Sequence, residues 1–130
     1  MIGRGRGRRA AIVLGTIAVA SVAIVPASQA GKSDKPAKGP KVKVADDFFS
    51  PTSVTIKPNT SVSFKWDPAN LDSHNAILQK GPKKINKKDF KSATGSIGVK
   101  FKPVFEKKGT YDFLCTIHPD VMKMKVIVKK

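Results

Sequence analysis

The chain has 130 residues, with 25 lysines and arginines against 9 acidic residues and a single cysteine. All four arginines lie within the first nine residues, so the formal net charge of +16 falls by those four charges to +12 over residues 31–130. Proteins that bind nucleic acid usually combine arginine with stacking aromatics. The scarcity of both beyond residue 9 argues against a nucleic-acid partner, and one cysteine excludes an internal disulfide.

The first 30 residues have the pattern of an export signal. The four arginines precede an apolar run over residues 10–25, and residues 28–30 (Ser-Gln-Ala) supply the small side chains of a cleavage site. We therefore predict a signal peptide over residues 1–30 and a secreted, periplasmic or cell-surface protein. A retained membrane anchor is the alternative, although the run is shorter than the roughly 20 apolar residues of a comfortable span.

Composition changes twice after the signal. Residues 31–41 are rich in Lys, Pro and Gly, which predicts a disordered basic linker. From residue 42 onward, short runs alternate apolar and polar side chains and are separated by Pro, Gly and Asn, as in half-buried strands. Their apolar members are Val42 and Val44, Val54 and Ile56, Val62, Phe64 and Trp66, Ala76 and Leu78, Val99 and Phe101, Tyr111 and Phe113, and Val126 and Val128.

About seven to eight such strands predict an all-β, Greek-key β-sandwich over residues 42–130. Residues 83–92 fit either a short helix or a surface loop, because only Ile85 and Phe90 stand among the lysines there.

Soft metal ligands gather near the C-terminus. Cys115 and His118 have C-x-x-H spacing, Met122 follows, and His74 is the only other histidine. Two imidazoles and one thiolate with a weak axial Met form a blue-copper electron-transfer site. Zinc is disfavoured because a thioether is a poor zinc ligand. Taken singly, each residue also has an ordinary explanation in a loop, a turn or the core.

Two segments resemble the cupredoxins, the small blue copper proteins such as plastocyanin, amicyanin and azurin. Gly109-Thr-Tyr-Asp-Phe-Leu-Cys-Thr-Ile-His-Pro is similar to their Gly-x-Tyr-x-(aromatic)-x-Cys-x-x-His motif, and Val62-Ser-Phe-Lys-Trp…His74-Asn75 to the strand and loop before the upstream histidine. The resemblance covers residues 42–130. It implies one copper ion held by His74, Cys115, His118 and Met122. It also implies that Asn75 ties the two ligand loops together near the thiolate.

Two positions depart from the amicyanin-like pattern. The expected position of the axial methionine holds Val121, and Met122 follows one residue later. When Met122 is aligned with the axial methionine of the family, the residues of the next strand also align with the family pattern. We therefore predict Met122 as the axial ligand rather than Val121 or Met124. Met124 stands where relatives usually have glycine, and it is either functionally neutral or alters the axial distance.

We predict an exported carrier of single electrons and not an enzyme. No enzyme constellation competes. Cys115 and His118 could form a nucleophile–base pair, but two loop residues three apart are better placed to bind one ion, and the acids are scattered. The resemblance implies that His118 is the electron exit, in an apolar patch built from Ile117, Pro119 and Val121. We expect a monomer whose lysines attract an acidic protein partner. The alternatives are a copper storage or delivery protein and a metal-free structural domain.

Overall fold

The computed structural model describes Gly15 and residues 35–130. The predicted signal peptide, apart from Gly15, lies outside the described residues, as do residues 31–34 of the predicted linker. The described residues 35–130 belong to one compact unit. Among the described residues, no helix is long and apolar enough to cross a membrane.

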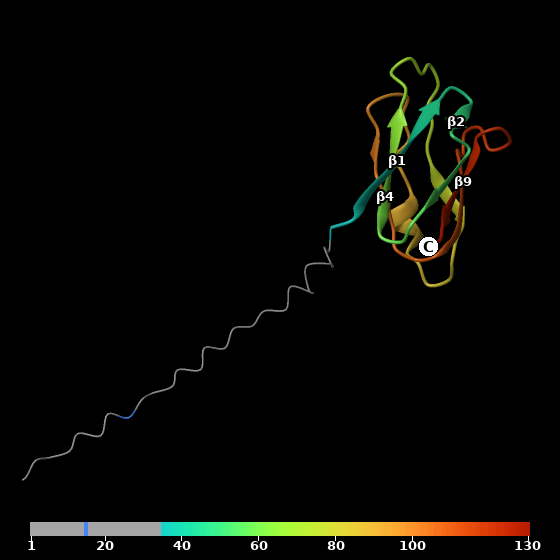
Figure 1. The fold of residues 1–130 in the computed structure, drawn as a ribbon. Coiled ribbons are helices and arrows are strands. Elements are labelled where there is room, and N and C mark those ends of the chain that lie inside the picture. The colour runs from blue at the N-terminus through green and yellow to red at the C-terminus, as the bar shows by residue number, and fades with distance from the viewer. Residues whose placement is uncertain (1–14, 16–34) are drawn as a thin grey trace, which may run out of the picture. The chain divides into compact units, whose positions relative to one another are not determined.

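The domain is a sandwich of two sheets, which confirms the predicted all-β fold (Figure 1). Its strands are β1 (Ala37–Ala45), β2 (Phe48–Ser50), β3 (Ser53–Ile56), β4 (Thr60–Trp66), β5 (Ile77–Lys80), β6 (Lys100–Phe101), β7 (Val104–Phe105), β8 (Gly109–Leu114) and β9 (Lys123–Val128). The first sheet has the order β2-β1-β4-β6, with β7 also paired to β4, and the second has the order β3-β9-β8-β5. The chain crosses repeatedly between the sheets, and β1 pairs with β4, and β3 with β9, in parallel.

The alternating apolar residues fill the space between the sheets. Val42, Val44, Phe64, Tyr111 and Val126 are almost fully buried, while the lysines between them face solvent. Aromatic rings join the layers, and the rings of Phe64 and Phe113 lie 5.5 Å apart, centroid to centroid. All members of this core lie between residues 42 and 128, so the domain has a complete core of its own.

Three local features differ from, or refine, the sequence-based expectation. Strand β1 begins at Ala37, within the segment 31–41 that was expected to be a linker, because Ala37 and Lys38 pair with Thr60 and Ser61. Pro103 separates β6 from β7, and both short pieces pair with β4, which accounts for a ninth strand. Between residues 83 and 92 the chain forms a 3-10 helix, Lys87–Phe90, capped by the side chain of Asn86.

Candidate metal centre

The predicted ligand residues converge at one end of the sandwich. His74 lies in the β4–β5 connection, while Cys115 and His118 lie in the β8–β9 loop. One ligand atom from each of these three residues lies within 4.8 Å of the other two. The two imidazole centroids are 5.0 Å apart, and Cys115 Sγ is 3.9 Å from His118 Nδ1. Residues about forty positions apart in the sequence thus form one cluster of a thiol and two imidazoles.

His74 is fully buried and firmly oriented. Its backbone forms an antiparallel bridge with Gly95, and its carbonyl accepts a hydrogen bond from Trp66 Nε1 at 3.2 Å. Its Nε2 lies 2.8 Å from Asp46 Oδ1, whereas its buried Nδ1 has no hydrogen-bond partner. A hydrogen bond to a carboxylate requires the proton on Nε2, so Nδ1 of the neutral ring keeps a free lone pair. An unpartnered buried nitrogen of this kind suits a metal ligand.

Asp46, in the β1–β2 turn, supports His74 from behind. Besides the imidazole, its carboxylate accepts hydrogen bonds from the backbone N–H groups of Leu71, at 2.9 Å, and Asp72, at 3.2 Å. The Leu71 N–H, followed by the hydrogen bond from His74, holds the pKa of Asp46 below its ordinary value. In the sequence, Asp46 and Asp47 are only a pair of adjacent acids. No local signal could reveal the contact, since it joins residues 28 positions apart.

Asn75 ties the two ligand loops together, as the family resemblance implied. Its side-chain oxygen accepts a 2.8 Å hydrogen bond from the backbone N–H of Thr116, and its Nδ2 donates to the hydroxyls of Thr116 and Thr94. Its own backbone N–H points to Cys115 Sγ at 3.5 Å. The thiol is therefore held beside His74 by a polar network that both loops share, centred on the buried side chain of Asn75.

The β8–β9 loop turns Met122 inward and Val121 outward. The backbone N–H of Met122 donates to the His118 carbonyl, and the Met122 carbonyl accepts from the Cys115 N–H, both at 3.0 Å. The Met122 side chain is fully buried, whereas Val121 is 64% exposed. Met124 is a buried residue of β9, in register with Phe113 of β8.

His118 is the ligand candidate that reaches the surface, with 22% of its side chain exposed. Ile117 and Val121 beside it are exposed apolar residues, as the predicted patch requires. Two carboxylates also face its Nε2: Asp47 Oδ1 lies at 3.4 Å and Asp72 Oδ2 at 3.8 Å. The edge of this imidazole therefore combines apolar and acidic neighbours, and sequence reasoning missed the acids.

Comparison with known proteins identifies the family. The model of copper-binding proteins of the plastocyanin/azurin family matches residues 40–129. The chain belongs to this family. It is also 30% identical, over 110 residues, to amicyanin-alpha from Methylorubrum extorquens, covering 85% of this chain and 88% of that protein.

Solved structures confirm the cupredoxin fold. Amicyanin from Paracoccus versutus has 24% identity and a TM-score of 0.55, covering 77% of this chain and 87% of its own. A purple cupredoxin from Nitrosopumilus maritimus has 23% identity and a TM-score of 0.55, covering 70% of this chain and all of its own.

The donor set of this cupredoxin fits copper. A thiolate and two neutral imidazoles are the strong donors of a type 1 site, and a thioether is available on the same loop. The unpartnered Nδ1 of His74, in an otherwise satisfied buried network, is the observation that speaks most directly for a metal ligand.

Proposed function

We propose that this protein is a type 1 copper electron carrier. His74 Nδ1, Cys115 Sγ and His118 Nδ1 would hold the metal, and Met122 would provide the weak axial donor. The cluster of one sulfur and two imidazole nitrogens within 4.8 Å carries the proposal. The full burial of Met122 and the outward position of Val121 support the choice of axial residue.

Bound copper supplies a one-electron couple, and the chain keeps the donors in place for both oxidation states. Asp46 orients one imidazole, and Asn75 fixes the cysteine loop against the histidine loop. Cys115 and His74 are fully buried, so bulk water is kept from the sulfur and from the inner imidazole. Donors that hydrogen bonds hold in both loops would move little when the copper changes oxidation state, which favours rapid electron exchange.

We propose His118 as the point where electrons leave, since it joins the buried cluster to the surface. A protein partner would contact the apolar side chains of Ile117 and Val121 around it. The attraction of an acidic partner by the lysines stays a prediction. Residues 115–122 of the β8–β9 loop contain no lysine, and Asp47 and Asp72 face the imidazole edge, so any such attraction would come from lysines outside this loop.

The remaining expectations extend this proposal. Residues 1–30 would direct export, residues 31–36 would link them to the folded domain, and the protein would act outside the cytoplasm as a monomer. Its role would be electron transfer rather than catalysis.

Voltammetry of the copper-loaded protein tests the proposal against copper storage. An electron carrier gives a reversible one-electron couple and retains its copper in the presence of a moderate chelator. An irreversible couple, with rapid loss of copper to the chelator, would favour storage or delivery and contradict electron transfer.

A further inference from the structure

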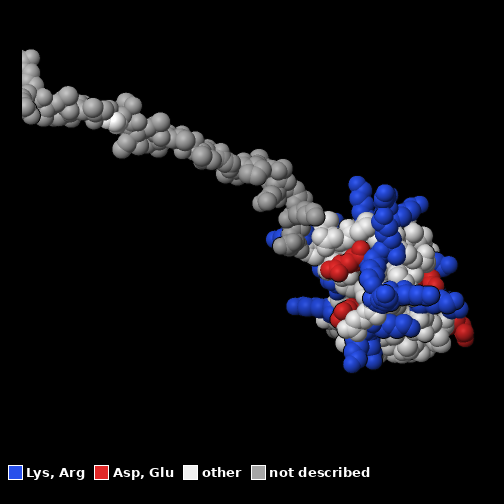
Figure 2. Space-filling view, turned by 90° about the horizontal axis from the view of Figure 1, so that it is seen from below, with Lys and Arg blue, Asp and Glu red and all other residues white. Residues whose placement is uncertain are grey.

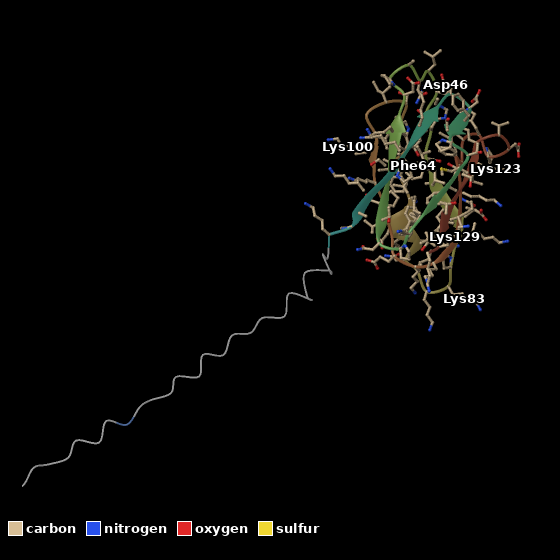
Figure 3. The ribbon with its side chains drawn as sticks, viewed as in Figure 1. Asp46, Phe64, Lys83, Lys100, Lys123 and Lys129 are labelled. Atoms are coloured by element: carbon tan, nitrogen blue, oxygen red, sulfur yellow. The ribbon has the colours of Figure 1, made fainter. Side chains whose placement is uncertain are left out.

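Lysines are absent from the chain segments that form the metal centre. The segments around the centre, residues 44–50, 66–77, 92–98 and 114–122, contain no lysine or arginine. Acidic residues are concentrated there instead: Asp46, Asp47, Asp67, Asp72 and Asp120. Figure 3 shows Asp46 at one end of the domain and Lys83 at the other.

Four chain segments bring lysines together at the end opposite the metal centre. Lys107 Nζ donates to the carbonyls of Lys83 and Lys84, at 3.4 and 2.7 Å, which joins the loop after β5 to the turn before β8. Asn59 pairs with Phe105, and the N–H of Lys129 donates to Ile56, which adds the β3–β4 turn and the C-terminus. We call this surface the lysine end. It comprises Lys57, Lys83, Lys84, Lys107, Lys108, Lys129 and Lys130, all exposed.

The lysine end is broad and polar. Seen from below the view of Figure 1, the domain presents a surface covered by lysines, with acidic side chains scattered among them (Figure 2). The segments that form it come from both sheets, so the positive charge extends across the sandwich. Among the described residues, the exposed large apolar side chains are Phe48, Leu71, Ile97, Ile117 and Val121, and all of them belong to the segments around the metal centre.

We propose that the lysine end docks electrostatically on an anionic phospholipid bilayer and leaves the metal centre facing away from it. A cluster of exposed lysines with no large exposed apolar side chain to insert suits lipid headgroups, each lysine adding to the attraction. The chain enters the folded domain at this end, since Ala37, where β1 begins, bonds to Asn59. A membrane anchor retained over the apolar run 10–25, the alternative to a cleaved signal, would hold the same end at a bilayer, which favours a bilayer over a soluble polymer. This orientation keeps His118 accessible to a redox partner.

Vesicle co-sedimentation of residues 31–130 tests the proposal without the apolar N-terminal run, and the complete core of this fragment supports its independent folding. The probes are phosphatidylcholine vesicles with and without phosphatidylglycerol. We expect binding to the anionic vesicles only, weakening as ionic strength rises to about 0.15 M. The experiment does not depend on copper, so its failure leaves the proposed electron transfer untouched.

Two variants with the same net charge separate docking at one end from general attraction. The first carries Lys57→Gln, Lys83→Gln, Lys108→Gln and Lys129→Gln, and the second carries Lys41→Gln, Lys65→Gln, Lys100→Gln and Lys123→Gln on the strands. We expect the first to weaken vesicle binding by at least about tenfold, and the second to retain most of it. Circular dichroism checks that both variants fold.

Three outcomes would overturn the proposal. Equal losses in the two variants would show attraction by net charge without orientation. Equal binding to neutral vesicles would exclude an electrostatic bilayer contact. Binding to soluble polyglutamate without binding to anionic vesicles would assign the lysine end to an anionic polymer.

Discussion

Asp46 illustrates how one side chain outside the ligand set can control a metal centre. Its carboxylate is fixed by two backbone N–H groups and contacts the imidazole of His74 at Nε2. A carboxylate in this position fixes the tautomer of the ring and makes Nδ1 a stronger donor. Its negative charge also favours Cu(II) over Cu(I), so this residue should lower the reduction potential.

We therefore predict that Asp46→Ala weakens Cu(II) binding by about 10- to 100-fold and raises the reduction potential. Asp46→Asn keeps an acceptor for Nε2. Its Cu(II) affinity and its reduction potential should therefore lie between those of Asp46→Ala and those of the wild type. Competition titration and voltammetry measure the two effects, with Asp120→Ala, an exposed acid of the β8–β9 loop, as the control. Unchanged affinity and potential in Asp46→Ala would show that the contact is incidental.

Met122 provides the second prediction at this scale. Met122→Leu conserves volume, so unfolding free energy should change by less than about 1.5 kcal/mol. Loss of the weak thioether donor should nevertheless raise the reduction potential, because the axial ligand tunes it. Val121→Ala, on the exposed side of the same loop, should leave the potential unchanged. A potential that responds to Val121→Ala and not to Met122→Leu would reverse our choice of axial residue.

At the level of elements, Tyr111 of β8 links a buried strand to the turn before it. Its ring is fully buried, and its hydroxyl donates to the carbonyl of Lys107 at 2.8 Å. Burial raises the pKa of Tyr111 above its ordinary value of 10.0. The stabilisation linked to this raised pKa is fully present below pH 10 and is lost as pH rises through the folded-state pKa.

Tyr111→Phe should therefore lower the free energy of unfolding by about 1 kcal/mol near neutral pH, through loss of one hydrogen bond. The difference from the wild type should shrink as pH rises above 10. Chemical denaturation at several pH values measures this difference, in which the effect of lysine deprotonation cancels. A difference that grows with alkaline pH would contradict the assigned environment.

The strands were largely predictable because their apolar residues alternate, but the ends and neighbours of strands were not. Strand β1 starts early through pairing with β4, which is distant in sequence, and β2 has only three residues. The candidate ligand residues could be proposed from the sequence because one cysteine, two histidines and a family motif limit the choice. The contacts that Asp46, Asp47 and Asp72 make with the imidazoles could not be predicted from the sequence, since they depend on how separate loops meet in space.

Considered as a whole, the molecule has its metal centre at one end and a cluster of seven lysines at the other, with further lysines along the strands. Composition predicts the net charge but not its separation, which arises because the turns rich in lysine fold to the end opposite the ligand loops. The electrostatic field of this protein is therefore directional. It should influence how the protein is oriented when it meets a charged surface, as well as how often it does so.

Copper binding should stabilise the whole domain. A ligand at 100 times its dissociation constant adds about 2.7 kcal/mol to the free energy of unfolding, which raises the melting temperature of a domain this size by about 11–22 °C. Thermal unfolding of wild type and Cys115→Ser, with and without Cu(II), checks this expectation. The same increase in both proteins would show that copper stabilises the fold from another site.

The most direct test of the central claim is an absorption spectrum recorded while Cu(II) is added to the protein. A thiolate bound to Cu(II) together with two imidazoles should give an intense blue or purple charge-transfer band that saturates at one equivalent. The band should disappear in Cys115→Ser and in His74→Ala, and persist in the Asp120→Ala control. A protein that folds normally and gives no such band would contradict the assignment of this cluster as a type 1 copper site.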